Sequence, residues 1–529
     1  MPKKNFEISS KVDYSLLAKK QILEFLEGLK GKDYTVKELN SSMKKLFKMG
    51  KMVVPVCLSK LKESDEELAP IICYALEYAN DYSLVSPLMD ILIMPGVSDK
   101  VKTRILSVLA HYGVDATELP LEYILKDYNR ITRVSMMEML EDINRDYFLI
   151  PYILEDLQDF PLESKLNYIY DIGCYRMEKS IPLLEVLAKV DEAPVAEEAV
   201  KAISKIKTGK ALFVLNRLLK QLKDEKVKKI IEREILRLKF SGICESTFER
   251  PFKLKQPYKI LLTAIDGLGS RALWVVWKHP LLKRKYCSVS FLINISSGIK
   301  DCWSVSRLSL KEFKESSKDL SRTTVIAEID GSYAIKLLED AIWQNNKSGN
   351  PLPYQYYFWQ GVIEDSLSTE IVPTPYIPDF NEYDLGEIKL NHNYLIKNFE
   401  LLNYPMFEDW FFSEPRVYDF AEEYKSKKGF FLKKLTLEKT EKLFFQFTEE
   451  IILPRLNILK RMLELSADFL RLLDEKELVK VVLSAILHLD MQPIYYHPLI
   501  QRIIIESLKV ALTNLKNGFD IRLNPEVFD

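Results

Sequence analysis

The sequence has few of the residues from which recognisable metal and redox sites are built. Its 529 residues include 6 cysteines and 5 histidines. No cysteines form a CxxC pair and no histidines form an HxH or HExxH pair, so a metal site would have to be assembled from distant segments. A disulfide framework is not indicated either. We therefore expect reduced, mostly buried thiols, no metal and no cofactor.

Long apolar runs and an excess of one charge are also missing. No segment approaches the roughly 20 apolar residues that cross a bilayer, and the first residues, MPKKNFEISSKVDYS, lack the apolar core of a signal peptide. The 75 basic residues are matched by 76 acidic ones, which leaves no global electrostatic footprint for nucleic acid or an anionic membrane. These absences predict a soluble cytoplasmic protein without a membrane partner. Its length predicts two to four domains.

Prolines recur through the first half of the chain with a nearly constant spacing. They stand at positions 55, 87, 120, 151 and 182, and Phe213 stands one further step of 31 residues along. Proline is tolerated in the first turn of a helix, so each is expected to mark a helix start. The segments that begin at these positions are alike: PVCLSKL, PLMDILI, PLEYILK, PYILEDL, PLLEVLA and FVLNRLL. Between them lie second segments with apolar residues at helical spacing, such as 67–79, 101–113, 131–143, 195–207 and 227–239.

Two helices per repeat, about six times over, form a unit that must stack on its neighbours to bury its apolar face. The pattern predicts an α-solenoid domain over residues 1–243, in which a helical pair precedes the repeats and Thr35 and Glu38 are spaced as a capping box. This part of the chain resembles the HEAT-repeat family, particularly its short form named after phycobilisome lyases. The likeness is best over 178–240, with VAEEAVKAISKIK and VKKIIEREILRLK as second helices. HEAT-like families include scaffolds, transport adaptors, lyase subunits and some DNA-repair glycosylases, so the resemblance implies a binding surface more than a reaction.

The helical period ends near Gly242, and a β-rich region follows. Residues 258–265, 271–278 and 286–294 are rich in Val, Ile, Trp, Tyr and Phe, and the third alternates apolar with polar residues. Such alternation predicts an antiparallel sheet with one face exposed. A fourth strand is expected at 323–329. With helices expected at about 310–316, 332–344 and after Pro353, residues 250–368 are predicted to form a small α+β domain.

The remainder of the chain returns to a helical pattern. A segment with several prolines, 369–387, indicates a linker, and residues 388–529 are expected to form a helical bundle. Asp474 with Glu477, and Asn517 with Gly518, supply a start and a stop signal for two of its helices. The predicted fold class is therefore mainly α, with a solenoid, a small α+β module and a helical domain.

The stretch AIDGLGSRALWVVWKHP, residues 264–280, holds the only cluster that suggests a nucleotide site. Gly267, Gly269 and Ala272 satisfy the permissive pattern G-x-G-x-x-[GA]. That pattern works only where a helix N-terminus points at a pyrophosphate. The residues that should form this helix are instead rich in Trp and Val and end at Pro280, so a second strand is favoured.

An Asp-Gly pair between two β-rich runs predicts a hairpin turn, because glycine supplies the positive φ that such turns require. At the tip of this hairpin, Asp266, Ser270 and Arg271 are expected to be exposed. The sequence leaves two interpretations open: a bare turn, which is favoured, or a turn that also contacts a ligand or a partner.

Two further segments offer candidate sites with a structural alternative. Asp301, in SSGIKDCWSVSR, is expected in a loop that reaches the same end of the sheet, although a loop pinned by a buried Trp303 explains the stretch without a ligand. At 329–332, Asp330 or Ser332 is expected to cap the following helix, an interpretation favoured over an anion site near Gly331.

Basic residues gather between 220 and 239, where Lys226, Lys228, Lys229 and Arg233 suggest a patch for nucleic acid. Acidic residues are interleaved with them, so a solvated helix face with internal ion pairs is the favoured interpretation.

The sequence as a whole predicts a non-enzymatic scaffold or adaptor that binds another protein through the solenoid surface. The first alternative is an enzyme or small-ligand sensor with a site at the edge of the central sheet. The second is a HEAT-like protein that binds nucleic acid.

Overall fold

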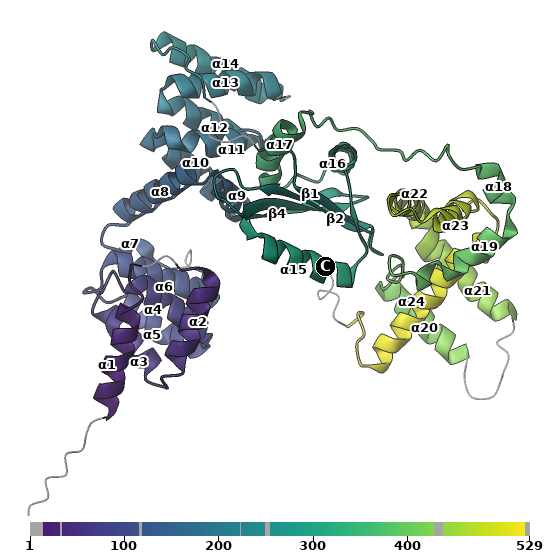
Figure 1. Ribbon diagram of the computed structural model, residues 1–529, viewed down its shortest axis with the longest axis horizontal. Coiled ribbons are helices and arrows are strands. Elements are labelled where there is room, and N and C mark those ends of the chain that lie inside the picture. Colours follow the sequence, from purple (N-terminus) through teal and green to yellow (C-terminus); the bar gives the residue numbers. More distant parts are fainter. Residues whose placement is uncertain are drawn as a thin grey trace, which may run out of the picture. The chain divides into compact units, whose positions relative to one another are not determined.

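A computed structural model describes residues 14–31, 34–115, 119–222, 224–248, 254–427 and 437–523. In these residues the protein is mainly helical, with a small five-stranded antiparallel sheet (Figure 1). Internal contacts divide the chain into two compact units, Met1–Glu141 and Asp142–Asp529, with the boundary inside helix α8 (Tyr128–Arg145). None of the described helices combines the length and the apolar character needed to cross a bilayer.

The first unit is built from helices that pack in two layers. They are α1 (Tyr14–Glu27), α2 (Val36–Phe47), α3 (Val53–Lys62), α4 (Ala69–Ala79), α5 (Val85–Leu92), α6 (Asp99–His111) and the short α7 (Leu121–Ile124). Helix α3 contacts α1 and α5, and α4 contacts α2 and α6, while α3 packs on α4 and α5 on α6. Pro55 and Pro87 lie in the first turns of α3 and α5, as predicted. The predicted capping box between Thr35 and Glu38 is also present, at the start of α2.

The second unit begins with the same alternation of helices. They are α9 (Ile150–Gln158), α10 (Leu162–Tyr175), α11 (Ile181–Leu187), α12 (Ala193–Ile206), α13 (Gly209–Gln221) and α14 (Glu225–Phe240). Helix α12 contacts α10 and α14, and α11 contacts α13. Pro151 and Pro182 lie in the first turns of α9 and α11. Helices α10 and α12 approach closely at Gly173, where a Cβ would lie 2.8 Å from the Ala202 side chain.

The sheet comprises β1 (Lys259–Thr263), β2 (Ser270–Lys278), β3 (Lys285–Asn294), β4 (Gly298–Ser309) and β5 (Ile326–Glu328). The strand order is β4-β3-β2-β1-β5, and every neighbouring pair is antiparallel. Strand β4 corrects the expectation of a loop around Asp301, because this residue lies within a twelve-residue strand that pairs with β3. Trp303 is correspondingly not a buried anchor and is 40% exposed.

Helices cover both faces of the sheet (Figure 1). On one face, Phe313 of α15 (Leu310–Thr323) packs against Trp274. This helix is longer than predicted, so β5 starts later and the expected open face is partly covered. On the other face lie α16 (Gly331–Ser348) and α17 (Tyr354–Leu367), and Trp277 stacks on Trp359 with ring centroids 5.5 Å apart.

Helix α17 joins the sheet to the preceding helices, since it contacts both α9 and α11. The Tyr354 N–H donates to the Gln158 side chain over 2.7 Å, and the Tyr354 hydroxyl donates to Glu192. Lys165 lies 3.0 Å from the same Glu192 carboxylate. Residues 142–240 therefore belong to the same compact unit as the sheet.

The segment 369–384 has no regular secondary structure, but it is fixed along α16. The Val372 N–H donates to Glu339 over 3.1 Å, and the Tyr376 N–H donates to Asp340 over 2.9 Å. The proline-containing stretch thus carries backbone donors that meet carboxylates of a neighbouring helix.

The last part of the chain is helical. It comprises α18 (Leu385–Leu390), α19 (His392–Lys397), α20 (Pro415–Lys427), α21 (Leu437–Phe447), α22 (Leu456–Leu472), α23 (Lys476–Leu487) and α24 (Pro498–Lys516). Helix α22 packs on α23, and α24 packs on α20. Gly518 has a φ of +83° just after α24, which confirms the predicted stop signal. The predicted start signal at Asp474 is wrong, because Glu475 is the residue before α23 and makes no side-chain cap.

Candidate functional site beside the first hairpin

The predicted hairpin is present and its turn is stabilised from within. Asp266 accepts hydrogen bonds from the backbone N–H groups of Leu268, over 2.9 Å, and Ser270, over 2.7 Å. The positive φ of the turn, +77°, belongs to Gly269 and not to Gly267 of the Asp-Gly pair, where it was expected. The Asp266 carboxylate therefore stabilises the turn from within.

The expectation that Asp266, Ser270 and Arg271 are exposed is wrong, since Asp266 is half-buried and the other two are buried. Ser270 is buried and Arg271 is only 3% exposed, because β2 begins at Ser270 and its next side chain lies under other elements. Tyr333 and Asp340 of α16 lie close enough to act electrostatically on the Arg271 guanidinium, and burial lowers its pKa. Its Nε and Nη1 atoms have no hydrogen-bond partner in the described part of the chain.

Arg271 belongs to a set of buried and half-buried polar side chains that we call the polar cluster: Arg271, Tyr333, Asp340, Tyr376, Arg461 and Asp468. Asp468 of α22 is fully buried and accepts hydrogen bonds from the hydroxyls of Tyr333, over 2.6 Å, and Tyr376, over 2.9 Å. Arg461, also on α22, donates to Asp340 over 3.1 Å and to the Tyr376 carbonyl over 2.5 Å. The polar cluster thus fixes α22 against α16 and the segment 369–384.

Asp301 is not brought to the hairpin tip. It stands opposite Leu292 in β4, is exposed, and accepts a hydrogen bond from the backbone N–H of Cys302. The residue that links the two turns at this end of the sheet is Asn294, whose amide donates to the Ser270 hydroxyl over 3.0 Å and to the Leu268 carbonyl over 2.9 Å. Of the four predicted residues, Asp266 and Ser270 lie together, Arg271 points inward and Asp301 lies elsewhere.

The hairpin turn also docks on the C-terminal part of the chain. The Trp410 indole donates to the Ile265 carbonyl over 3.2 Å, and a Cβ at Gly267 would overlap the Asp409 carbonyl oxygen. Burial raises the pKa of the Asp409 carboxyl, although the Gly267 N–H acts in the opposite direction. Gly267 is therefore required for close approach, a role that the turn pattern alone does not reveal.

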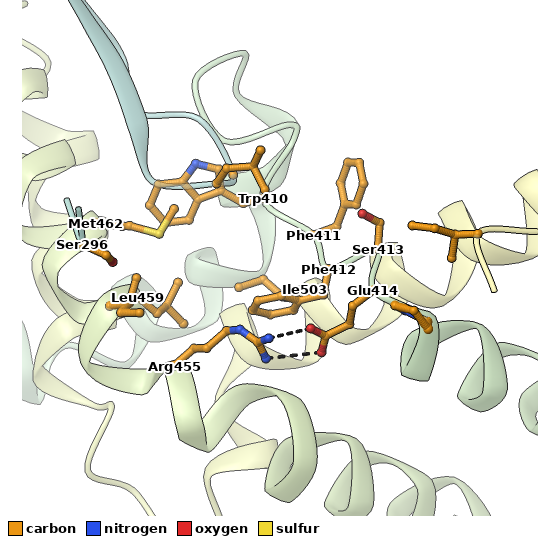
Figure 2. Close-up of a pocket in the computed structure, with 15 residues that line it drawn as sticks. Ser296, Trp410, Phe411, Phe412, Ser413, Glu414, Arg455, Leu459, Met462 and Ile503 are labelled. Carbon is orange, nitrogen blue, oxygen red and sulfur yellow. Dashed lines mark hydrogen bonds and ion pairs between the residues drawn. The ribbon is translucent and has the colours of Figure 1, made fainter. Parts of the chain in front are cut away.

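A pocket of about 530 Å³ opens where this turn meets the C-terminal helices. Figure 2 shows aromatic side chains of the segment before α20 and aliphatic side chains of α22 around it. Its charged groups form one pair, in which both terminal nitrogens of Arg455 contact the Glu414 carboxylate, at 3.3 and 2.5 Å. We call this the apolar pocket; its lining residues are Gly267, Leu268, Ser296, Trp410, Phe411, Phe412, Ser413, Glu414, Pro415, Arg455, Ile458, Leu459, Met462, Ile503 and Ile521.

Several elements give the apolar pocket its shape. The turns after β1 and β3 supply Leu268 and Ser296, and α22 supplies Leu459 and Met462. A π-helical turn, Thr448–Ile452, lies between α21 and α22 and just before Arg455. Such turns are frequent at functional sites because they redirect the side chains that follow.

A second pocket of about 500 Å³ adjoins the first, and Ser296 and Ile458 line both. We call it the polar pocket after its three charged side chains, Asp340, Lys347 and Arg461, although much of its lining is apolar, for example Ile295, Trp343 and Ile377.

The predicted cap of α16 is confirmed, since Asp330 accepts a hydrogen bond from the Tyr333 N–H over 2.8 Å. The basic residues of α14 form the expected mixed face. Lys228 pairs with Glu225 at 2.9 Å and Arg233 with Glu234 at 3.3 Å, while Lys226 and Lys229 are exposed.

The apolar pocket is lined mainly by aromatic and aliphatic side chains. Its lining contains neither His nor Cys. Across the described ranges, no group of three or more His, Cys, Asp and Glu side chains is placed to hold a metal ion.

No model of a known protein family matches the chain, and a search of curated proteins finds no match. The function is therefore argued from the geometry of the chain itself.

Proposed function

We propose that the chain is a non-enzymatic, cytoplasmic interaction protein whose helical repeats are of the HEAT type and bind another protein. The proposal is supported by the packing of α1 to α6, in which each of α3 and α4 contacts the helices two places before and after it. Repeats that stack in this way produce extended surfaces, which their families use for binding.

The observation that carries the proposal is the exposure of aromatic side chains on the first unit. Tyr82 is 68% exposed and Tyr123 is 86% exposed, and Tyr78 of α4 is also exposed. Tyrosine is enriched in protein interfaces, where its ring adds contact area and its hydroxyl adds a hydrogen bond.

Site-specific photo-crosslinking in the full chain tests this proposal. A photoreactive phenylalanine analogue replaces Tyr82 or Tyr123, and Tyr496 near α24, which is exposed as well, provides the matched control. We expect a discrete crosslinked partner from the first two positions and none from the third. Equal crosslinking at all three positions, or none at Tyr82 and Tyr123, contradicts the proposal.

The apolar pocket supports a second candidate function, the binding of a small ligand. Its volume lies within the range of known ligand sites, and such sites combine an apolar lining with a few polar groups. A thermal-shift screen with apolar compounds tests this function, because a ligand of the native state raises the melting temperature by mass action. Met462→Trp, which fills the pocket, is expected to abolish the shift, whereas Ile396→Trp on the surface of α19 is expected to preserve it. A screen without any shift removes this candidate.

A further inference from the structure

We propose that the apolar and polar pockets together form one site for an amphipathic organic anion, with its aliphatic body in the apolar pocket and its carboxylate at Lys347. The inference rests on the second candidate function above and adds the chemical class of the ligand.

The two pockets are neighbours and have two lining residues in common. Ser296, in the turn between β3 and β4, lines both of them, and so does Ile458 of α22. Neither residue is buried, so their side chains border open space instead of filling a core. A ligand longer than one pocket can therefore lie across these two exposed side chains and occupy both pockets.

The apolar pocket selects the body of the ligand. Its charged residues, Arg455 and Glu414, satisfy each other through two contacts, as Figure 2 shows. The pocket consequently offers no unpaired charge to a ligand, whereas Leu459, Met462 and Ile503 offer aliphatic contacts. Burying an apolar chain here gains the free energy of removing it from water.

The polar pocket offers the head of the ligand solvent-facing side-chain donors that no other described protein group occupies. The side-chain donors of Ser296, Gln344, Lys347 and Asn457 make no hydrogen bond or ion pair within the described residues. The Lys347 ammonium lies 5.0 Å from the centroid of the Trp343 ring. An acceptor-rich group would satisfy several of these donors at once.

The acidic residue of the polar pocket is already occupied. One oxygen of Asp340 accepts from the Tyr376 N–H and the other from Arg461. The lining thus holds two cations against one neutralised carboxylate, and Lys347 is the cation without an anion. This charge distribution favours an anionic head over a cationic one.

The test is calorimetric titration of the full chain with three probes that share one aliphatic chain: decanoate, decanol and decyltrimethylammonium, each below its aggregation concentration. We expect decanoate to bind. We expect Lys347→Glu to lower the affinity for decanoate about tenfold, because the charge that faces the carboxylate is reversed. Lys318→Glu, an exposed lysine of α15 on the other face of the sheet, provides the matched control and is expected to leave the affinity unchanged. Decyltrimethylammonium is expected to show the opposite response to Lys347→Glu.

A second variant tests the continuity of the site. Ile458→Trp places a bulky side chain at the shared wall without burying it in a core, and we expect it to weaken decanoate at least tenfold. If decanoate and decanol bind alike, and Lys347→Glu changes neither, the inference about the head is wrong while the apolar pocket still binds ligands. If none of the three probes binds, both the inference and the second candidate function fail.

Discussion

The first unit and the junction between the sheet and the C-terminal helices are held together by different kinds of contact. In the first unit, apolar side chains from Ile22 to Leu125 form one core, and helices close in sequence supply them to each other. At the junction, Asp468 bonds to Tyr333 and Tyr376, which lie 135 and 92 residues away in the chain. The same chain thus contains a region assembled from local apolar repeats and a region assembled from distant polar partners.

The difference matters for how each region responds to change. An apolar core loses stability in proportion to the side-chain volume removed, since its contacts are numerous and weak. A buried polar network instead loses the whole hydration cost of every group left without a partner. We therefore expect the junction to tolerate single substitutions less well than the repeats.

The largest effect is expected for Asp468→Ala. It removes the acceptor of the buried Tyr333 hydroxyl and the half-buried Tyr376 hydroxyl, as well as the partner of Arg471. It also leaves Arg271 buried with less compensating charge. Breaking a buried charged pair typically costs 3–5 kcal/mol, so we expect the second unit to lose about 4 kcal/mol in urea unfolding.

The matched control for this substitution is Asp490→Ala, because Asp490 is exposed and lies 3.8 Å from Lys389. It is expected to cost less than about 1 kcal/mol. Hydrogen exchange should show that Asp468→Ala weakens the protection of backbone amides in α16 and α22. The protection of the amides in the first unit should not change. Equal costs for the two substitutions would show that the polar cluster does not hold the junction.

The second-largest effect is expected from pH, which should change the stability of the second unit more than that of the first. His497, before α24, is fully buried, and burial lowers its pKa from 6.5 to about 4. The unfolded chain binds a proton at this residue between these two pH values and the folded chain does not. Stability is therefore complete above about pH 6.5 and falls as the pH drops towards 4, by up to about 3 kcal/mol.

Burial also lowers the pKa of His279 in the same unit, which adds to the loss in acid. The histidine of the first unit, His111, is exposed at the end of α6. Acid is thus expected to unfold the second unit before the first. Hydrogen exchange of the two units, compared at pH 7 and pH 5, measures this difference. His497→Phe should flatten the pH dependence of the second unit; an unchanged slope in this variant would assign the acid sensitivity to other groups.

A smaller effect is expected from one methyl group at the hairpin. In Gly267→Ala the new Cβ would overlap the Asp409 carbonyl, so the turn must move away from the C-terminal segment. Overpacking of this kind costs about 2 kcal/mol. Gly96→Ala in the first unit is the control, since nothing lies within 4 Å of a Cβ there and its φ is not positive. A cost for Gly96→Ala as large as that for Gly267→Ala would contradict the close approach at the junction.

Gly267 also illustrates how far the sequence could predict the molecule. The proline spacing placed the starts of α3, α5, α9 and α11, because helix periodicity and proline chemistry are local properties. The hairpin was predictable for the same reason. The contact of Gly267 with Asp409 was not, since no local pattern in either segment encodes the other.

The same limit applies to the candidate site. Asp266 was found from the Asp-Gly pair, but the inward direction of Arg271 depends on Tyr333, Asp340 and Asp468, which come from distant helices. The pockets were missed as well, because the walls of the apolar pocket alone come from six separate stretches of chain. A charged residue within an apolar strand pattern was the one available signal that Arg271 is buried beside other polar groups.

The smallest effect is expected from charge reversal on α14, with Lys228→Glu and Lys229→Glu combined. The substitution breaks an ion pair with Glu225 whose members are 28% and 75% exposed, and such pairs contribute little. New acidic charge near the start of α14 also interacts favourably with the helix dipole, which offsets part of the loss. We expect the free energy of unfolding to change by less than about 1 kcal/mol. We also expect retention on immobilised DNA to be unchanged between roughly 50 and 300 mM salt. A clear drop in retention would instead favour nucleic-acid binding, because counterion release makes such binding depend on these charges even where stability does not.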